Sequence, residues 1–127
     1  MIGPRSKNFS SKELCCRCGC KEGPKLEMIS ALQRVRDALG RPMILTSAMR
    51  CKKHNEKVGG RPKSRHLDGL AVDVSTAKFS EAEWIALLEI ASETGFLGIG
   101  LYDTFVHLDL RDVLTVWDGR THKTKKF

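Results

Sequence analysis

The sequence has 127 residues, 41% of them hydrophobic and 29% charged, a composition typical of a soluble domain, and no apolar run approaches the ~20 residues of a membrane-spanning helix. The formal net charge of +7 favours anionic partners. Because only 6% of the residues are aromatic and no nucleic-acid-binding module is recognisable, we expect no binding to nucleic acid, and we expect no stable membrane insertion.

Residues 1–25 form a polar, cysteine-containing segment of a single domain that we expect to span residues 1–127. Within this segment, "NFSSKEL" predicts a short helical turn capped by Ser10 or Ser11. The segment has no apolar stretch of the kind that a secretory signal peptide requires. The sequence therefore predicts a protein that is made in the cytoplasm without a signal peptide.

The first long helix is predicted at residues 26–39, where apolar residues recur at intervals of three and four. Pro24 precedes this segment and Gly40 follows it, as at many helix ends. "MILTS" at residues 43–47 predicts a short strand. Residues 48–65 are basic, contain two glycines and a proline and show no hydrophobic period, so we expect a long loop there.

The second half of the chain predicts one further helix among several strands. The helix begins with a capping box from Ser80 to Glu83 and ends at Gly95, and Trp84 and Trp117 are expected to pack in or against the core. Strands are predicted at residues 70–74, 96–102, 105–111 and 113–117, the last within a C-terminal strand and basic tail at 112–127. This order predicts an α+β fold: a small, mainly antiparallel sheet with two main helices packed against it.

The cysteines are distributed unevenly, because four crowd the sequence "CCRCGC" at residues 15–20 while Cys51 stands apart. Two structural interpretations remain open. The cysteines bind a structural zinc ion, although without the paired C-x2-C spacing of a zinc finger. Alternatively, a bridge joins the cluster to Cys51 and ties the N-terminal segment to the body of the fold. We assign this structural role to Cys16, Cys18, Cys20 and Cys51.

Two histidines and an aspartate are candidate metal ligands. Side chains alternate across a strand, so in "FVHLDLR" His107 and Asp109 share the polar face while their apolar neighbours enter the core. Asp73 is placed in the same way in "LAVDV", and His66 lies in the segment before it, with small residues between the two. His66, Asp73 and His107 match the ligand set of a catalytic zinc site, in which a fourth position is left for water.

"SRHLDGLAVDV" at residues 64–74 fits the signature S-x-H-x-x-G-x-A-x-D of the zinc D-alanyl-D-alanine carboxypeptidases and L-alanyl-D-glutamate endopeptidases that act on cell walls. "FSSKEL", "LTSAMRC" with "HNEKVGG", and "GIGLYDTFVHLDLR" resemble further stretches of the small, endolysin-like phage and bacterial branch of that group. The resemblance covers roughly residues 9–111 and implies the fold of those peptidases, which hedgehog-type signalling domains share.

The resemblance implies a role for each matching residue. His66, Asp73 and His107 correspond to the three ligands of one catalytic zinc ion. Arg50, in "SAMRC", corresponds to an arginine that binds the substrate and stabilises the charged oxygen. Ser64 corresponds to a serine that supports the loop carrying His66.

The catalytic carboxylate departs from the pattern of the resemblance. Better-known relatives have an acid three residues before the third ligand, where this sequence has Thr104. We favour Asp103 for this role, because a turn there would swing its carboxylate over the metal. Asp109 is the alternative, since it shares the face of His107, but it is also suited to hold His107 in its metal-binding tautomer or to bind Arg50.

The sequence thus predicts a monomeric zinc peptidase that hydrolyses a peptide bond in the peptidoglycan stem peptide, as a carboxypeptidase or an endopeptidase. A basic surface suits an anionic cell wall. The enzyme would reach the wall after release or delivery by another protein. A non-catalytic zinc-binding module of the same fold is the main alternative, because the expected acid is absent at Thr104. A nucleic-acid-binding zinc protein built on "CCRCGC" is a weaker one.

Overall fold

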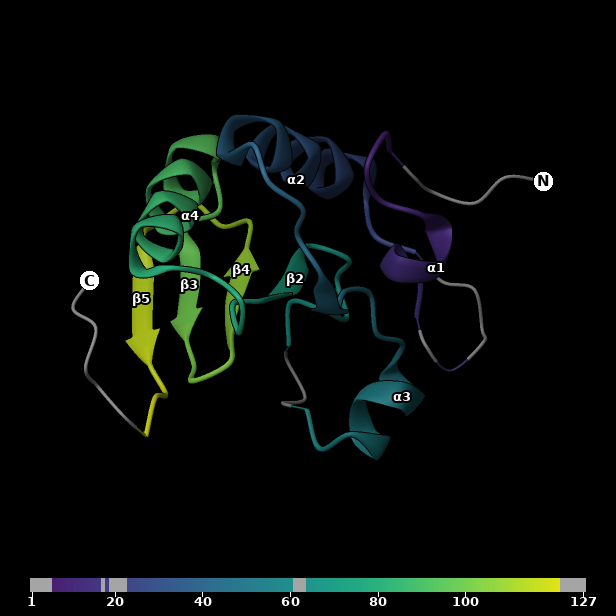
Figure 1. The fold of residues 1–127 in the computed structure, drawn as a ribbon. Helices are drawn as coiled ribbons and strands as arrows, with labels where there is room; N and C mark the ends of the chain where they lie inside the picture. Colours follow the sequence, from purple (N-terminus) through teal and green to yellow (C-terminus); the bar gives the residue numbers. More distant parts are fainter. Residues whose placement is uncertain (1–5, 17, 19–22, 61–63, 122–127) are drawn as a thin grey trace.

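The computed structural model describes residues 6–16, 18, 23–60 and 64–121 and has an α+β fold built on a five-stranded sheet (Figure 1). Both long helices and the strands lie where the sequence predicts them, with ends that differ by one or two residues. In chain order the elements of the described residues are α1 (Ser11–Leu14), α2 (Leu26–Leu39), β1 (Leu45–Ser47), α3 (Lys52–Lys57), β2 (Ala71–Ser75), α4 (Glu81–Thr94), β3 (Gly98–Leu101), β4 (Phe105–Asp109) and β5 (Thr115–Asp118).

The sheet has the strand order β1-β2-β4-β3-β5. Neighbouring strands are antiparallel except for β3 and β5, which are parallel. The predicted mainly antiparallel sheet is therefore confirmed. In this order β2 and β4, which are far apart in sequence, lie side by side in the interior of the sheet.

The helices α2 and α4 cover one face of the sheet, and the hydrophobic core lies between them and the strands (Figure 1). Alternation along the strands sends one set of side chains into this core and the other set to the opposite face. The set in the core includes Val72, Val74, Ile99, Val106 and Leu108, all of them completely buried. Polar side chains of β2 and β4 are thereby left on the face away from the long helices.

Local capping explains where the long helices end. The Ser80 side chain accepts a hydrogen bond from the backbone N–H of Glu83, whose carboxylate accepts one from the N–H of Ser80, so the predicted capping box is present. Gly40 and Gly95 end α2 and α4 in the left-handed conformation, which glycine adopts without a steric penalty. None of the helices in the described part of the chain is both long and apolar enough to cross a membrane.

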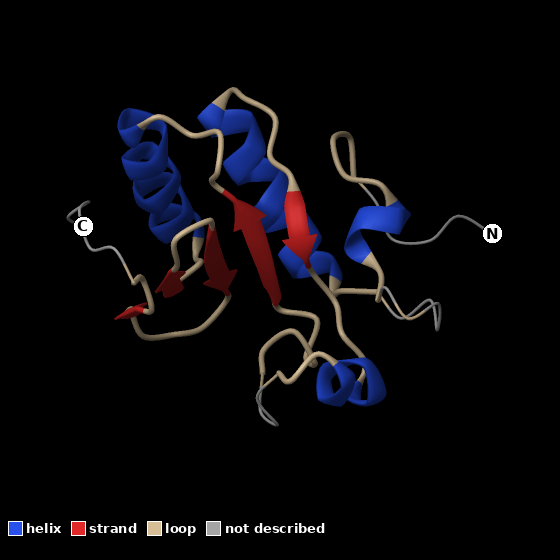
Figure 2. Cartoon of the chain, turned by 60° about the horizontal axis from the view of Figure 1, so that its bottom comes forward, coloured by secondary structure: helices blue, strands red, loops and turns tan. Residues whose placement is uncertain are grey.

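The region between β1 and β2 is not the continuous loop that the sequence predicts. It contains α3, which lies apart from α2 and α4, beyond the end of the sheet (Figures 1 and 2). The helix shows no hydrophobic period because Asn55 is its only buried residue. It begins at Cys51, whose sulfur accepts a hydrogen bond from the N–H of His54. A six-residue surface helix of this kind needs no apolar stripe.

Candidate metal centre

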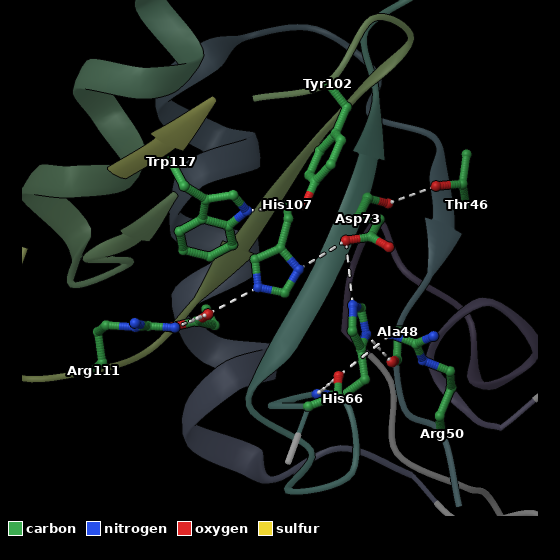
Figure 3. A network of polar contacts seen from close by, with 11 residues as sticks. Thr46, Ala48, Arg50, His66, Asp73, Tyr102, His107, Arg111 and Trp117 are labelled. Carbon is green, nitrogen blue, oxygen red and sulfur yellow. Dashed lines mark hydrogen bonds and ion pairs between the residues drawn. The ribbon is translucent and has the colours of Figure 1, made fainter. Parts of the chain in front are cut away.

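Asp73 and His107 are directly opposed residues of the antiparallel pair β2 and β4, on the face away from α2 and α4. Cβ atoms of such cross-strand pairs lie about 4.5–5.5 Å apart. His66 comes from the turn that leads into β2, and its side chain points toward Asp73 (Figure 3). The structure thus brings together the three residues that the sequence predicts as metal ligands, from one turn and two strands.

The conformation of the turn that carries His66 depends on Gly69. Its φ of +70° lies in the left-handed region, and a Cβ atom at this position would lie 3.0 Å from backbone atoms of Pro24 and Lys25. The carbonyl group of Gly69 accepts a hydrogen bond of 3.0 Å from the N–H of Lys25. The glycine in "SRHLDGLAVDV" therefore lets the turn pack against the start of α2.

The three ligand atoms converge on one point. Oδ1 of Asp73 lies 3.2 Å from Nε2 of His66 and 3.0 Å from Nδ1 of His107. All three atoms lie within 4.8 Å of one another. The side chains are largely shielded from solvent, with 1% of His66, 14% of Asp73 and 13% of His107 exposed.

The other nitrogen of each imidazole ring faces a group that accepts hydrogen bonds. Nδ1 of His66 lies 2.5 Å from the carbonyl oxygen of Ala48, and Nε2 of His107 lies 2.8 Å from a carboxylate oxygen of Asp109. In the tautomers that bind a metal ion, these outer nitrogens carry the ring protons. The inner nitrogens, which face the carboxylate of Asp73 (Figure 3), are then free to offer lone pairs to the metal.

Three lone-pair donors that face one another repel unless a proton or a metal cation lies between them. Two imidazole nitrogens and a carboxylate oxygen are ligands that Zn²⁺ prefers, and outer hydrogen bonds of this kind orient histidine ligands in zinc proteins. The donor set therefore fits a zinc ion held by His66, Asp73 and His107.

Hydrogen bonds keep the carboxylates of the site ionised. Burial raises the pKa of Asp73, but hydrogen bonds with His107 and His66 bring this pKa down to about 2. Burial also raises the pKa of Asp109, and hydrogen bonds with His107 and Arg111 hold it at about 2. Burial lowers the pKa of His107, but the hydrogen bonds with Asp109 and Asp73 outweigh burial and raise it. The site is thus strongly attractive to positive charge, either a proton or a metal ion.

Asp109 links the metal centre to an arginine. Its completely buried carboxylate accepts the hydrogen bond from His107 and forms two more with Arg111, of 2.6 and 2.7 Å. Gly98 is opposite Asp109 on the neighbouring strand, and a Cβ atom there would collide with the carboxylate. The glycine in β3 therefore makes room for the group that orients His107.

A pocket of about 590 Å³ opens over the metal centre. Arg50 lies at its edge, where its backbone N–H donates to the carbonyl oxygen of His66 and its guanidinium to Oγ of Ser64. Ser64 Oγ in turn accepts from the backbone N–H of His66. The Nε atom of Arg50 is buried without a hydrogen-bond partner among the described residues, and burial lowers the pKa of this side chain. The pocket is lined by Arg50, Val58, Gly59, Gly60, Ser64, Arg65, His66, Asp73, Tyr102, Phe105, His107, Asp109, Arg111 and Trp117.

Aromatic residues that the sequence did not single out for the site form one wall of the pocket. The indole N–H of Trp117 donates to the hydroxyl oxygen of Tyr102, at 2.9 Å, and the Tyr102 ring stacks on Phe105. Trp117 also lies beside His107, with the ring centres 5.3 Å apart. The parallel pairing of β5 with β3 places Trp117 opposite Gly100, where the absent side chain leaves space for the indole ring. No local signal in the sequence reveals that pairing.

Asp103 lies outside this pocket. It is an exposed residue between β3 and β4, and its carboxylate accepts hydrogen bonds from the backbone N–H and the hydroxyl group of Thr121, at 3.0 and 2.5 Å. Thr104 is also exposed. Among the described residues, the carboxylates that line the pocket belong to Asp73 and Asp109.

A second group of side chains that could hold a metal ion lies at the start of α3. Cys16, Cys18 and Cys51 bring their sulfur atoms together there, and Cys20 lies outside the described residues. The four described cysteines, Cys15, Cys16, Cys18 and Cys51, are all free thiols.

Comparison with protein families finds a match that spans the candidate metal centre. A family model described as Peptidase M15 matches residues 7–109, which include the turn of His66 and the strands of Asp73 and His107. No curated protein sequence matches this chain. Because the matched residues make up most of the 127 in the sequence, the chain belongs to the M15 family of zinc-dependent peptidases.

Proposed function

We propose that the protein is an endolysin-like peptidase that cleaves a peptide bond in the stem peptide of peptidoglycan, with one catalytic zinc ion held by His66, Asp73 and His107. The observation that carries the proposal is the convergence of two imidazole nitrogens and a carboxylate oxygen beneath an open pocket. A structural site would be closed by a fourth protein ligand, whereas an open side is typical of catalytic zinc.

The residues around the proposed zinc ion have different roles in hydrolysis. Zinc, when bound, supplies a Lewis acid that polarises the scissile carbonyl group and makes water acidic enough to ionise near pH 7. Asp109 and the Ala48 carbonyl group hold the two histidine rings in the tautomers that leave lone pairs for the metal. Ser64 fixes the backbone of His66 and the guanidinium of Arg50.

Arg50 provides the contact with negative charge on the substrate. Its buried Nε–H has no partner among the described residues, so a substrate oxygen that accepts from it would satisfy an otherwise costly donor. Arg65 and Arg111 also line the pocket. Stem peptides of peptidoglycan carry free carboxylates close to their peptide bonds, and a pocket with several guanidinium groups suits such a substrate better than an apolar peptide.

Asp103 and Asp109 are the two candidates for the group that takes the proton from water. Asp109 lines the pocket, but His107 and Arg111 already engage both of its oxygen atoms. Asp103 is exposed, and it directly follows Tyr102, which lines the pocket. We assign proton transfer to Asp103 in the substrate-bound enzyme and the positioning of His107 to Asp109.

Digestion of purified peptidoglycan tests the proposed reaction. The protein loaded with zinc is expected to release fragments whose masses, measured by mass spectrometry, identify the cleaved bond. Loss of a terminal D-alanine indicates a carboxypeptidase, and cleavage within the stem indicates an endopeptidase. His66→Ala, which removes one ligand, is the inactive control.

A folded, zinc-loaded protein that releases no fragment would contradict the enzymatic proposal and favour a non-catalytic zinc module. We propose that the active enzyme is a monomer, because the described residues form the whole ligand set within one chain. The substrate lies outside the cytoplasmic membrane, so the enzyme would act there after release or delivery.

A further inference from the structure

Three cysteine sulfur atoms gather at the N-terminal end of α3, and none of the three residues lines the proposed catalytic pocket. Sγ of Cys18 lies 3.4 Å from Sγ of Cys16 and 3.5 Å from Sγ of Cys51. All three sulfur atoms lie within 4.8 Å of one another. Cys16 and Cys18 follow α1, whereas Cys51 belongs to the segment after β1, so the cluster joins two distant parts of the chain.

The separations fit a common metal ion better than a disulfide. A disulfide brings two sulfur atoms to about 2.05 Å and leaves a third excluded. Around a tetrahedral zinc ion with Zn–S bonds of about 2.3 Å, neighbouring sulfur atoms are about 3.8 Å apart. The measured separations of 3.4 and 3.5 Å are close to that edge length, and the third thiol belongs to the same group.

Two backbone N–H groups also point at sulfur atoms of the cluster. The N–H of Cys51 donates to Sγ of Cys16, and the N–H of His54 donates to Sγ of Cys51, each at 3.4 Å. Hydrogen bonds to an anionic acceptor are stronger than those to a neutral one, so both contacts would strengthen when the sulfur atoms bind a metal ion as thiolates. Thiolates are the form in which cysteine binds a metal, and soft sulfur ligands select zinc over magnesium or calcium.

We propose that Cys16, Cys18 and Cys51 provide three of the ligands of a second zinc ion, which has a structural role. The segment that this ion would hold carries two groups of the catalytic centre: Ala48, whose carbonyl oxygen orients His66, and Arg50, which faces the pocket. The same segment is tied to the N-terminal region by the hydrogen bond from the N–H of Met49 to the carbonyl oxygen of Leu14. The second zinc ion thus holds residues 48–51 in the position that the catalytic centre requires.

Metal content distinguishes the two sites. In the full-length protein purified under reducing conditions with zinc, elemental analysis is expected to find two zinc ions per chain. Cys18→Ser is expected to retain one, because Cys18 is exposed and its replacement leaves the core intact. Cys15→Ser is the matched control and is expected to retain two, since Cys15 lies outside the cluster. His66→Ala is expected to lose the catalytic ion alone.

Replacement of zinc by cobalt identifies the ligands independently of activity. Intense sulfur-to-cobalt charge-transfer absorption is expected in the wild type, in His66→Ala and in Cys15→Ser, and it should be absent from Cys18→Ser. Failure of the catalytic site would abolish peptide release without affecting this absorption, so the two proposals can fail separately. The second site is ruled out if the wild type binds one zinc ion without charge-transfer absorption, or if mass spectrometry finds two of the three thiols joined in a disulfide.

Discussion

At the residue scale, the candidate metal centre is a chain of hydrogen-bonded polar side chains. The guanidinium of Arg111 pairs with the carboxylate of Asp109, which contacts His107, and His107 faces the carboxylate of Asp73. Each group is oriented by the next, so the proposed ligand atoms would be held in place before a metal ion binds. Preorganisation of this kind reduces the entropy that metal binding must overcome.

Replacement of Asp109 by asparagine is expected to weaken zinc binding about 10–100-fold, the usual effect of losing a group that orients a metal ligand. An amide is a weaker acceptor for Nε2–H of His107, and it leaves Arg111 without its charged partner. Competition with a chromophoric chelator measures the affinity. Asp112→Asn, an exposed residue nearby, is the control, and equal affinities of the two variants would contradict the positioning role.

Asp103→Ala is expected to keep the zinc ion and to lose activity by about 100–10,000-fold, the usual contribution of a general acid–base group. Asp103 is not among the described residues that line the pocket, so metal binding has no reason to change. The ratio of kcat for the two proteins on a muropeptide substrate is the measurement. The matched variant Thr121→Val removes one hydrogen bond to Asp103 without removing the carboxylate, and it is expected to stay active. Near-normal activity of Asp103→Ala would move the proton transfer to Asp109.

At the element scale, most helices and strands could be predicted because their signals are local. The apolar spacing and the glycine at Gly40 define α2, and the capping box at Ser80 defines the start of α4. The short helix α3 could not be predicted, since its polar residues are stabilised by a cap at Cys51 and by neighbours distant in sequence. The polar faces of β2 and β4 could be predicted from alternation.

Ser80→Ala is expected to lower the free energy of unfolding by about 1 kcal/mol, the usual contribution of an N-cap side chain. The hydroxyl oxygen accepts from the N–H of Glu83, and alanine leaves that N–H without this partner. Urea denaturation measures the difference. Ser30→Ala, on the exposed surface of α2, is the control and should change stability by only a few tenths of a kcal/mol. An equal loss in both variants would show that the cap is not responsible.

At the scale of the whole molecule, the two faces of the sheet have different roles: one forms the hydrophobic core, and the other carries the candidate site. One face packs on α2 and α4, and the other carries the proposed metal ligands and the pocket. The proposed ligands come from a turn and two strands, and β4 is far from the other two in sequence. A bound metal ion would therefore crosslink these three parts of the chain.

Chelation is expected to lower the thermal unfolding midpoint, because a ligand that binds only the folded state stabilises it in proportion to the logarithm of its concentration. A free zinc concentration of 100 times Kd would contribute about 2.7 kcal/mol. Scanning calorimetry of the chelated and the zinc-loaded protein measures the shift, and added zinc should reverse it. His66→Ala should shift less on chelation than the wild type. An unchanged midpoint in the wild type would argue against zinc binding to the folded protein.

The amino-acid sequence by itself determined the fold class, the two long helices, the polar strand faces and the residues proposed as ligands, because periodicity, capping and a motif are properties of neighbouring residues. Only the tertiary structure decided which of these residues meet. The pairing of β2 with β4 placed Asp73 opposite His107, and the pairing of β5 with β3 brought Trp117 to the pocket. The same packing left Asp103 outside the pocket. Such contacts depend on strand register and turn geometry, which residues distant in the chain set together.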